Sequence, residues 1–262
     1  ILQTLRDSIF KYAPKARILT GLASYQIFEP GEALSHTARS TAEPGYYIDF
    51  FNSAWWIDSL NSEYYHKSKL VPGSEIIPFS FLLKPLESLA LNLGGTTGSL
   101  GTQKNRAVFK SKGSKIIAAP IICYESIYSD YVRDFTQLGA NIFCIITNDG
   151  WWENTPGYKQ HLRYAQLRAI ENHRCIVRSA NTGISAFIYP DGHIEQRTSW
   201  WNTQVISTLL PLYENRTLYA QTGDWIGKSS LLTSVLLILF QMLKWLYHII
   251  KKIAFNISNK EF

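Results

Sequence analysis

Cysteine is scarce in this 262-residue sequence, which contains only Cys123, Cys144 and Cys175 and no Cys-x-x-Cys pair. The number and spacing predict neither a disulfide framework nor a zinc site, so we expect no bound metal. Cys144 and Cys175 lie in apolar runs that are typical of core strands, where a thiol serves as a packing group. Cys123 is therefore the candidate for chemistry, with an inert buried thiol as the alternative.

Two further absences narrow the classes of partner. Lys and Arg do not cluster among aromatic residues in the pattern of a nucleic-acid surface, so we expect no DNA or RNA partner. The net charge of +6, together with 8 Trp and 15 Tyr, instead suits work at a membrane surface, with a mildly basic soluble protein as the alternative. The sequence opens on a helical pattern at Ile1 without the charged and apolar regions of a signal peptide, and it looks like a C-terminal fragment.

Strand and helix patterns alternate along the chain and predict an α/β fold. A polar loop is expected over 26–45, and the aromatic segment 46–57 is expected to form a strand pair or hairpin. Glycines at 94–98 predict a turn, and a phosphate-binding loop is disfavoured there because the Gly-Lys-Ser/Thr ending is missing. Strands are predicted over 17–23, 107–110, 115–122, 141–147, 175–179 and 185–189, and helices over 1–12, 129–138 and 158–173.

Residues 229–250 differ from the rest because they form a long apolar run, interrupted only by polar residues such as Lys244 and His248. About 20 helical residues cross the ~30 Å core of a bilayer, so the run predicts a transmembrane helix. An amphipathic surface helix is the alternative. Lys251 and Lys252 follow the run, and the positive-inside rule then predicts a cytoplasmic tail over 251–262 and a domain over 1–225 on the other side.

Cys123 follows the apolar run 116–122, and the residues after it are able to start a helix. A cysteine at such a turn has an exposed sulfur, and the next backbone N–H, that of Tyr124, is free to stabilise an oxyanion. Lys67 or Lys69 could supply an ammonium that lowers the pKa of the thiol, and composition alone does not choose between these two.

Several short segments around these residues form a pattern in which order and spacing are specific. They are 65–75 (Tyr-His-Lys-Ser-Lys-Leu-Val-Pro-Gly-Ser-Glu), 120–125 (Pro-Ile-Ile-Cys-Tyr-Glu), 147–152, 160–161, 168–172 and 178–183. Over about residues 17–225 the chain resembles the nitrilase, or carbon–nitrogen hydrolase, superfamily, and within it the family of apolipoprotein N-acyltransferases. The resemblance implies a four-layer α-β-β-α sandwich, here followed by one transmembrane helix.

The resemblance also implies roles for individual residues. It makes Cys123 the nucleophile and selects Lys67, rather than Lys69, as the catalytic lysine. Glu75 and Glu125 match supporting positions, Glu75 to orient Lys67 or the attacking group and Glu125 to hold the turn or line the pocket. Trp151, like Trp152 and His161, is expected either to shape the substrate mouth or to serve packing.

The family's general-base glutamate has no counterpart in the sequence. It is expected on a strand before Thr20-Gly21, but residues 1–19 contain only one acid, Asp7. We therefore expect the glutamate to lie upstream of Ile1 and the chain alone to be inactive.

The implied reaction is the transfer of an acyl chain from a phospholipid, through a Cys123 thioester and without a cofactor, to the N-terminal amine of a diacylglyceryl-cysteine lipoprotein. The implied location is the bacterial inner membrane, with the catalytic domain on the periplasmic side. Two alternatives remain: a nitrilase-type amidase that acts on a small amide, which the apolar segment disfavours, and a non-catalytic membrane-anchored remnant, which the missing glutamate favours.

Overall fold

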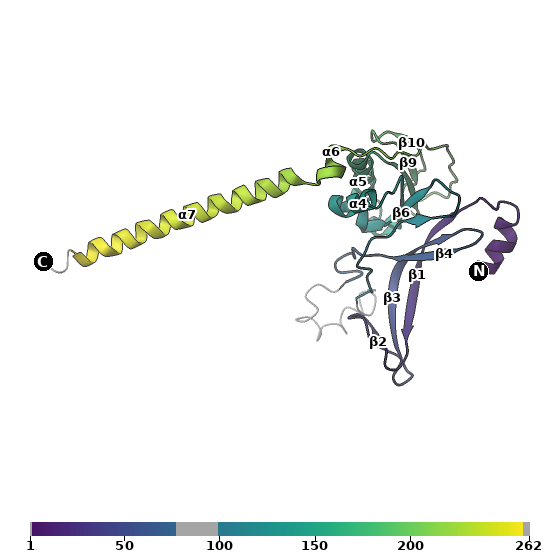
Figure 1. Cartoon of the computed structure of the whole chain (residues 1–262), viewed down its shortest axis with the longest axis horizontal. Helices are drawn as coiled ribbons and strands as arrows, with labels where there is room; N and C mark the ends of the chain where they lie inside the picture. The colour runs from purple at the N-terminus through teal and green to yellow at the C-terminus, as the bar shows by residue number, and fades with distance from the viewer. Residues whose placement is uncertain (1, 77–98, 259–262) are drawn as a thin grey trace. The chain divides into compact units, whose positions relative to one another are not determined.

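The computed structural model describes residues 2–76 and 99–258, so the glycine-rich turn expected at 94–98 lies outside the described residues. The chain divides into two units, residues 1–220 and residues 221–262, and each is described by itself (Figure 1).

The first sheet of the larger unit is built on one long antiparallel pair. Strand β1 (Ile18–Phe28) pairs with β3 (Tyr47–Ile57) along the full length of both. The short β2 (Arg39–Ser40) and β4 (Ser62–His66) also pair with β3. The prediction of a strand pair over 46–57 is wrong, because these aromatic residues form a single strand with partners on both sides. The loop expected over 26–45 is shorter than predicted, since it contains the end of β1 and all of β2.

The second sheet has six strands in the order β10-β9-β8-β7-β6-β5, with three parallel strands at its centre. The central strands are buried and apolar, as expected for parallel strands that are covered on both faces. The strands are β5 (Phe109–Lys110), β6 (Ile117–Ile122), β7 (Ile142–Thr147), β8 (Cys175–Ala180), β9 (Ala186–Ile188) and β10 (Ile194–Arg197).

Helices cover one face of this second sheet (Figure 1). The helices α4 (Ser129–Gln137) and α5 (Gly157–Asn172) contribute buried side chains such as Phe135 and Leu162 to the main core. Helix α5 is capped at its carboxyl end by His173, which adopts a left-handed conformation with φ of 53°. These two helices agree with the predicted ranges to within one residue at either end.

The two sheets pack face to face, and side-chain alternation along β3 decides what enters their interface. Ala54 and Trp56 belong to the main core, where the Trp56 ring stacks on Phe109 with the ring centroids 5.6 Å apart. Gly21 on β1 permits the close approach, because a Cβ there would meet Cγ2 of Ile146 at 2.7 Å.

The opposite face of the first sheet carries Trp55 and Ile57, which pack with Phe10. Phe10 ends the segment made of α1 (Leu2–Leu5) and the π-helix η1 (Arg6–Phe10). The layers therefore run helix, sheet, sheet, helices, and the predicted α-β-β-α fold is confirmed. Within the described residues, this short helical segment forms the outer layer over the first sheet.

The larger unit ends within the short helix α6 (Leu218–Thr222), and the smaller unit is dominated by α7 (Trp225–Ser258). Residues Trp225–Lys252 of α7 are long and apolar enough to cross a bilayer, with a mean hydropathy of 1.7, and none of this window is buried in the protein. The predicted apolar helix is therefore present, and it begins before residue 229.

Candidate active site

Cys123 occupies a sharp turn at the carboxyl end of β6. The strand ends at Ile122, and the 3₁₀ helix η3 (Cys123–Ile127) starts at once. Cys123 has a φ of 49°, in the left-handed region that residues other than glycine rarely adopt. Such a conformation persists only where the surroundings hold it, and it is often found at functional sites.

The turn faces a cleft made of two adjoining cavities, which we call the Cys123 cleft. One cavity, of about 710 Å³, is mainly apolar and includes Phe50, Val71 and Ile127 in its lining. The other, of about 630 Å³, includes Lys67 and Thr147. The residues that line both are Ala23, Asn52, Glu75, Cys123, Asn148 and Trp151.

An ion pair between a buried lysine and a partly exposed glutamate lies in the second cavity. Lys67 directly follows β4, and alternation from Tyr65 carries its side chain to the inner face of the sheet, where it is 1% exposed. Its Nζ lies 2.8 and 2.7 Å from the two carboxylate oxygens of Glu75. The backbone N–H of Val71 and the amide of Asn52 also donate to Glu75. This carboxylate thus holds the Lys67 ammonium in a fixed place.

Lys69, the alternative lysine, lies elsewhere. Its Nζ is 5.3 and 5.9 Å from the ring centroids of Tyr128 and Tyr131, and it lines neither cavity of the cleft. The structure therefore brings Lys67, and not Lys69, into the cleft with Cys123.

Glu125 does not enter the cleft but joins the backbone segments on which Lys67 and Cys123 lie. Its Oε1 accepts from the backbone N–H of Ser68 at 2.6 Å, and its Oε2 accepts from the backbone N–H of Ile122 at 2.8 Å. Ser68 follows Lys67 and Ile122 precedes Cys123. One fully buried carboxylate thus fixes the distance between the two sheets at the site.

Two tyrosines complete the surroundings of this carboxylate. The Tyr131 hydroxyl donates to Glu125 Oε1 at 2.7 Å, and the Tyr65 hydroxyl lies 3.4 Å from the same oxygen and also bonds to the Tyr131 hydroxyl. Burial and the charge of Glu125 raise the pKa of both phenols, so they keep their protons and remain donors. Burial also raises the pKa of Glu125 itself, which the hydrogen bonds from Ser68 and Ile122 partly offset.

Cys144 and Cys175 do not adopt the left-handed conformation of Cys123, and they line neither cavity of the Cys123 cleft. Burial raises the pKa of Cys144 to about 12 and that of Cys175 to about 11, so both stay thiols at neutral pH. A thiol is a poor nucleophile compared with a thiolate.

Tyr124 and Trp151 lie on the cleft. The Tyr124 ring packs edge-on against Tyr128, with the ring centroids 5.3 Å apart. Trp151 belongs to the short helix η4 (Asp149–Trp152), lines both cavities and is 75% exposed, so it is not a core residue. Asp7, the single acid before Thr20, is exposed, accepts from Gln3 at 3.1 Å and lines neither cavity.

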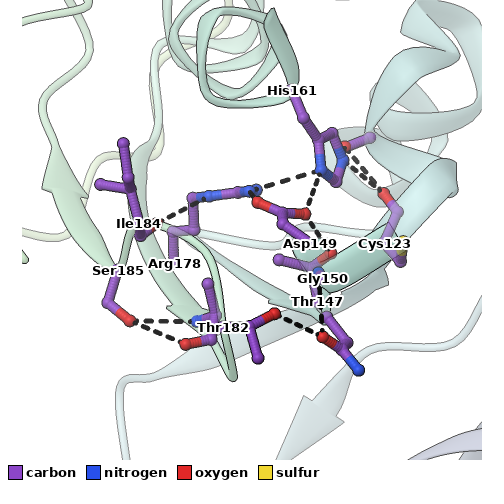
Figure 2. A network of polar contacts seen from close by, with 12 residues as sticks. Cys123, Thr147, Asp149, Gly150, His161, Arg178, Thr182, Ile184 and Ser185 are labelled. Carbon is purple, nitrogen blue, oxygen red and sulfur yellow. Dashed lines mark hydrogen bonds and ion pairs between the residues drawn. The ribbon is translucent and has the colours of Figure 1, made fainter. Parts of the chain in front are cut away.

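A network of buried polar side chains lies behind the Cys123 turn, and the sequence pattern does not predict that these side chains meet (Figure 2). His161, which the sequence suggested for the substrate mouth or for packing, contacts the carbonyl oxygen of Cys123 on one side and Asp149 on the other. Asp149 also pairs with Arg178. Asp149 and Arg178 belong to the motif segments 147–152 and 178–183, but nothing in their spacing shows that they meet. In the part of the chain that the structure describes, no group of three or more His, Cys, Asp or Glu side chains is placed to hold a metal ion.

Residues 33–218 match the family model of the carbon-nitrogen hydrolases, and the chain belongs to this family. Among curated proteins it is similar to the apolipoprotein N-acyltransferase of Chlorobaculum tepidum, with 35% identity over 164 residues that cover 62% of this chain and 31% of the relative. The enzyme of the same name from Shewanella oneidensis is 31% identical over 213 residues, which cover 79% of this chain and 38% of the relative. The chain thus spans about a third of the length of these relatives.

Among solved structures, an amidase from Nesterenkonia sp. superposes with a TM-score of 0.47 and 14% identity, covering 76% of this chain and 64% of the amidase.

The Glu125 bridge generates a prediction. In Glu125→Gln the side-chain amide nitrogen must face either the Ser68 N–H or the Ile122 N–H, which leaves one buried donor without an acceptor. We expect a loss of about 1–3 kcal/mol in the free energy of unfolding, measured in urea. Alkylation of Cys123 by iodoacetamide, followed by peptide mass spectrometry, should also slow several-fold because Lys67 is less well held.

Glu63→Gln is the matched control, because Glu63 is an exposed glutamate on β4. It should change neither quantity. A Glu125→Gln protein with unaltered stability and labelling would contradict the bridging role.

Proposed function

We propose that this chain carries the acyl-transfer site of a membrane-bound N-acyltransferase. Cys123 takes an acyl chain from a phospholipid as a thioester and passes it to the α-amine of the N-terminal diacylglyceryl-cysteine of a lipoprotein. The observation that carries the proposal is the shared cleft, in which Cys123 on its left-handed turn lines the same cavity as the Lys67–Glu75 ion pair. The similarity to curated apolipoprotein N-acyltransferases supports the choice of substrates.

Each side chain has a role that its contacts support. The Lys67 ammonium attracts the oxyanion that forms when the Cys123 sulfur attacks an ester. Glu75 balances the buried charge and fixes its direction through a charge-assisted hydrogen bond. The backbone N–H of Tyr124 is the second donor to the oxyanion. Glu125 holds the backbone segments that carry Lys67 and Cys123 at a fixed separation.

The reaction has two steps. The thiolate attacks the ester carbonyl, the carbon–oxygen ester bond breaks, and the lysophospholipid leaves as an alcohol after it gains a proton. The amine of the lipoprotein then attacks the thioester, loses a proton, and releases Cys123 as the amide forms. A thioester suits both steps because it resists water moderately and yet reacts readily with amines.

The larger cavity suits an acyl chain. Phe50, Phe51, Val71, Leu100 and Ile127 contribute to its mainly apolar lining, and Cys123 lies at its junction with the second cavity. An acyl group on the sulfur can therefore extend along apolar side chains, while the reacting carbonyl stays beside Lys67. Trp151 borders both cavities and is the residue we propose for contact with substrate at the mouth.

The general base is not assigned to a described carboxylate. Glu75 is engaged by Lys67, Glu125 by backbone N–H groups, and Asp149 by Arg178. A base supplied by a preceding segment therefore stays a prediction. Strand β1 lies at the end of the strand order of its sheet within the described residues, so its outer edge is open to a further strand.

The apolar helix supports the membrane assignment and disfavours a soluble amidase. We propose that α7 spans the inner membrane of a bacterium, with residues 251–262 in the cytoplasm and the Cys123 domain on the periplasmic side. Lys251 and Lys252 at the end of the apolar window supply the charge asymmetry for this orientation.

The proposed nucleophile is tested by mass spectrometry of the protein after incubation with phospholipid in detergent. We expect an acyl adduct on Cys123 that disappears in Cys123→Ala and persists in the control variants Cys144→Ala and Cys175→Ala. An adduct on Cys144 or Cys175, or one that remains in Cys123→Ala, would contradict the assignment of Cys123 as the nucleophile. If the base lies on a preceding segment, Cys123 of the chain alone should be acylated ~10²–10⁴-fold more slowly than Cys123 of a longer protein.

The proposed orientation is tested with reporters fused after Phe262. A fluorescent protein that folds only in the cytoplasm should be bright, and a phosphatase that is active only outside the cytoplasm should be silent. The reverse pattern contradicts the orientation, and activity in the soluble fraction contradicts the span.

A further inference from the structure

The peptide unit that joins Cys123 to Tyr124 is held from behind by two side chains. The Ser126 hydroxyl donates to the Cys123 carbonyl oxygen at 2.8 Å, and Nε2 of His161 lies 3.1 Å from the same oxygen (Figure 2). Nε2 of His161 is also 2.8 Å from Oγ of Ser126. One carbonyl oxygen is thus clamped by a serine and a histidine that also contact each other.

His161 is itself fixed by a buried ion pair. Its Nδ1 lies 2.8 Å from Oδ1 of Asp149, and Oδ2 of Asp149 lies 2.5 Å from the Arg178 guanidinium. Thr147 donates to Asp149 at 2.9 Å. Burial alone would raise the pKa of Asp149, but the His161 hydrogen bond and the Arg178 charge outweigh it and lower the pKa. An ionised carboxylate therefore orients the ring.

The contacts assign donors to the ring. The single Ser126 proton goes to the Cys123 oxygen, so Nε2 must donate to the serine and carbonyl oxygens. Nδ1 lies 2.8 Å from Oδ1 of Asp149 and 3.3 Å from the Arg178 guanidinium. His161 thus contacts the cysteine carbonyl through one ring nitrogen and the ion pair through the other.

The geometry of a peptide bond links this clamp to the cleft. In a trans peptide the C=O and the following N–H lie in one plane and point in opposite directions. When His161 and Ser126 hold the Cys123 carbonyl toward the interior, the Tyr124 N–H points the other way. This N–H is also among the first of the helix η3, where N–H groups have no intrahelical acceptor.

We propose that His161, with Asp149 and Arg178 behind it, is a positioning residue that aims the Tyr124 N–H at the oxyanion formed on Cys123. The inference rests on the proposed role of Cys123 as nucleophile.

The test compares two reactions of the same sulfur. Acylation by p-nitrophenyl butyrate develops an oxyanion, whereas alkylation by iodoacetamide does not. In His161→Phe, which keeps a ring but has no donor, acylation should slow by roughly 10²-fold, within the range for the loss of an oxyanion donor. Alkylation should stay within about twofold of the unmodified protein, because the thiol and Lys67 are untouched.

Three further variants sharpen the result. His161→Gln keeps an N–H donor near the Nε2 position and should recover most of the acylation rate. Ser126→Ala removes the other donor to the same carbonyl and should slow acylation by a smaller factor. His193→Phe is the control, because His193 is an exposed histidine that lines neither cavity of the cleft, and it should change neither rate.

Several outcomes would overturn the inference. Equal losses in both reactions of His161→Phe and Ser126→Ala would show that the network serves the thiol or the fold rather than the oxyanion. Unchanged acylation would show that the clamp is not needed. A Cys123 that reacts with neither reagent in the unmodified protein would overturn the nucleophile and this inference together, whereas a failure of phospholipid transfer alone leaves the comparison intact.

Discussion

The buried carboxylate of Glu125 is the constraint on which the rest of the site depends. Lys67 follows a strand of the first sheet and Cys123 follows a strand of the second, so nothing in either sheet alone fixes their separation. Glu125 bonds to the backbone beside each of them and sets this separation through two N–H groups. Because it bonds to the backbone, it tolerates a change in the side chains of Ser68 and Ile122.

Burying a carboxylate is costly, and the surroundings of Glu125 show how the cost is met. A buried charge is stable only when its oxygens receive hydrogen bonds or a counter-charge. Backbone N–H groups and the phenols of Tyr65 and Tyr131 supply the hydrogen bonds. The same principle recurs at Glu75 and Asp149, which pair with Lys67 and Arg178. The partly exposed Glu75 and the two buried carboxylates of Glu125 and Asp149 thus hold the lysine, the cysteine turn and the peptide plane behind it.

The sequence was sufficient where a local pattern decides the structure. The apolar runs 115–122 and 141–147 became β6 and β7, and the turn at Cys123 followed from a strand that precedes a helical segment. The sequence was insufficient where the structure of a segment depends on which other segment it pairs with. The aromatic segment 46–57 does not reveal whether it pairs with itself or with β1, and β4 is too short and polar to be recognised. Knowledge of β4 alone would not have distinguished Lys67 from Lys69, since alternation from Tyr65 places both on the same face. The network of Asp149, His161 and Arg178 joins three elements and has no local signal.

The central claim is that an oxyanion on Cys123 is stabilised by Lys67 and by the Tyr124 N–H. A crystal structure of the protein acylated at Cys123 tests it most directly. The account predicts the thioester carbonyl oxygen at about 2.7–3.1 Å from the Tyr124 nitrogen, with the Lys67 ammonium in contact with the same oxygen. A thioester oxygen that points to solvent, with the Tyr124 N–H bonded elsewhere, would contradict it.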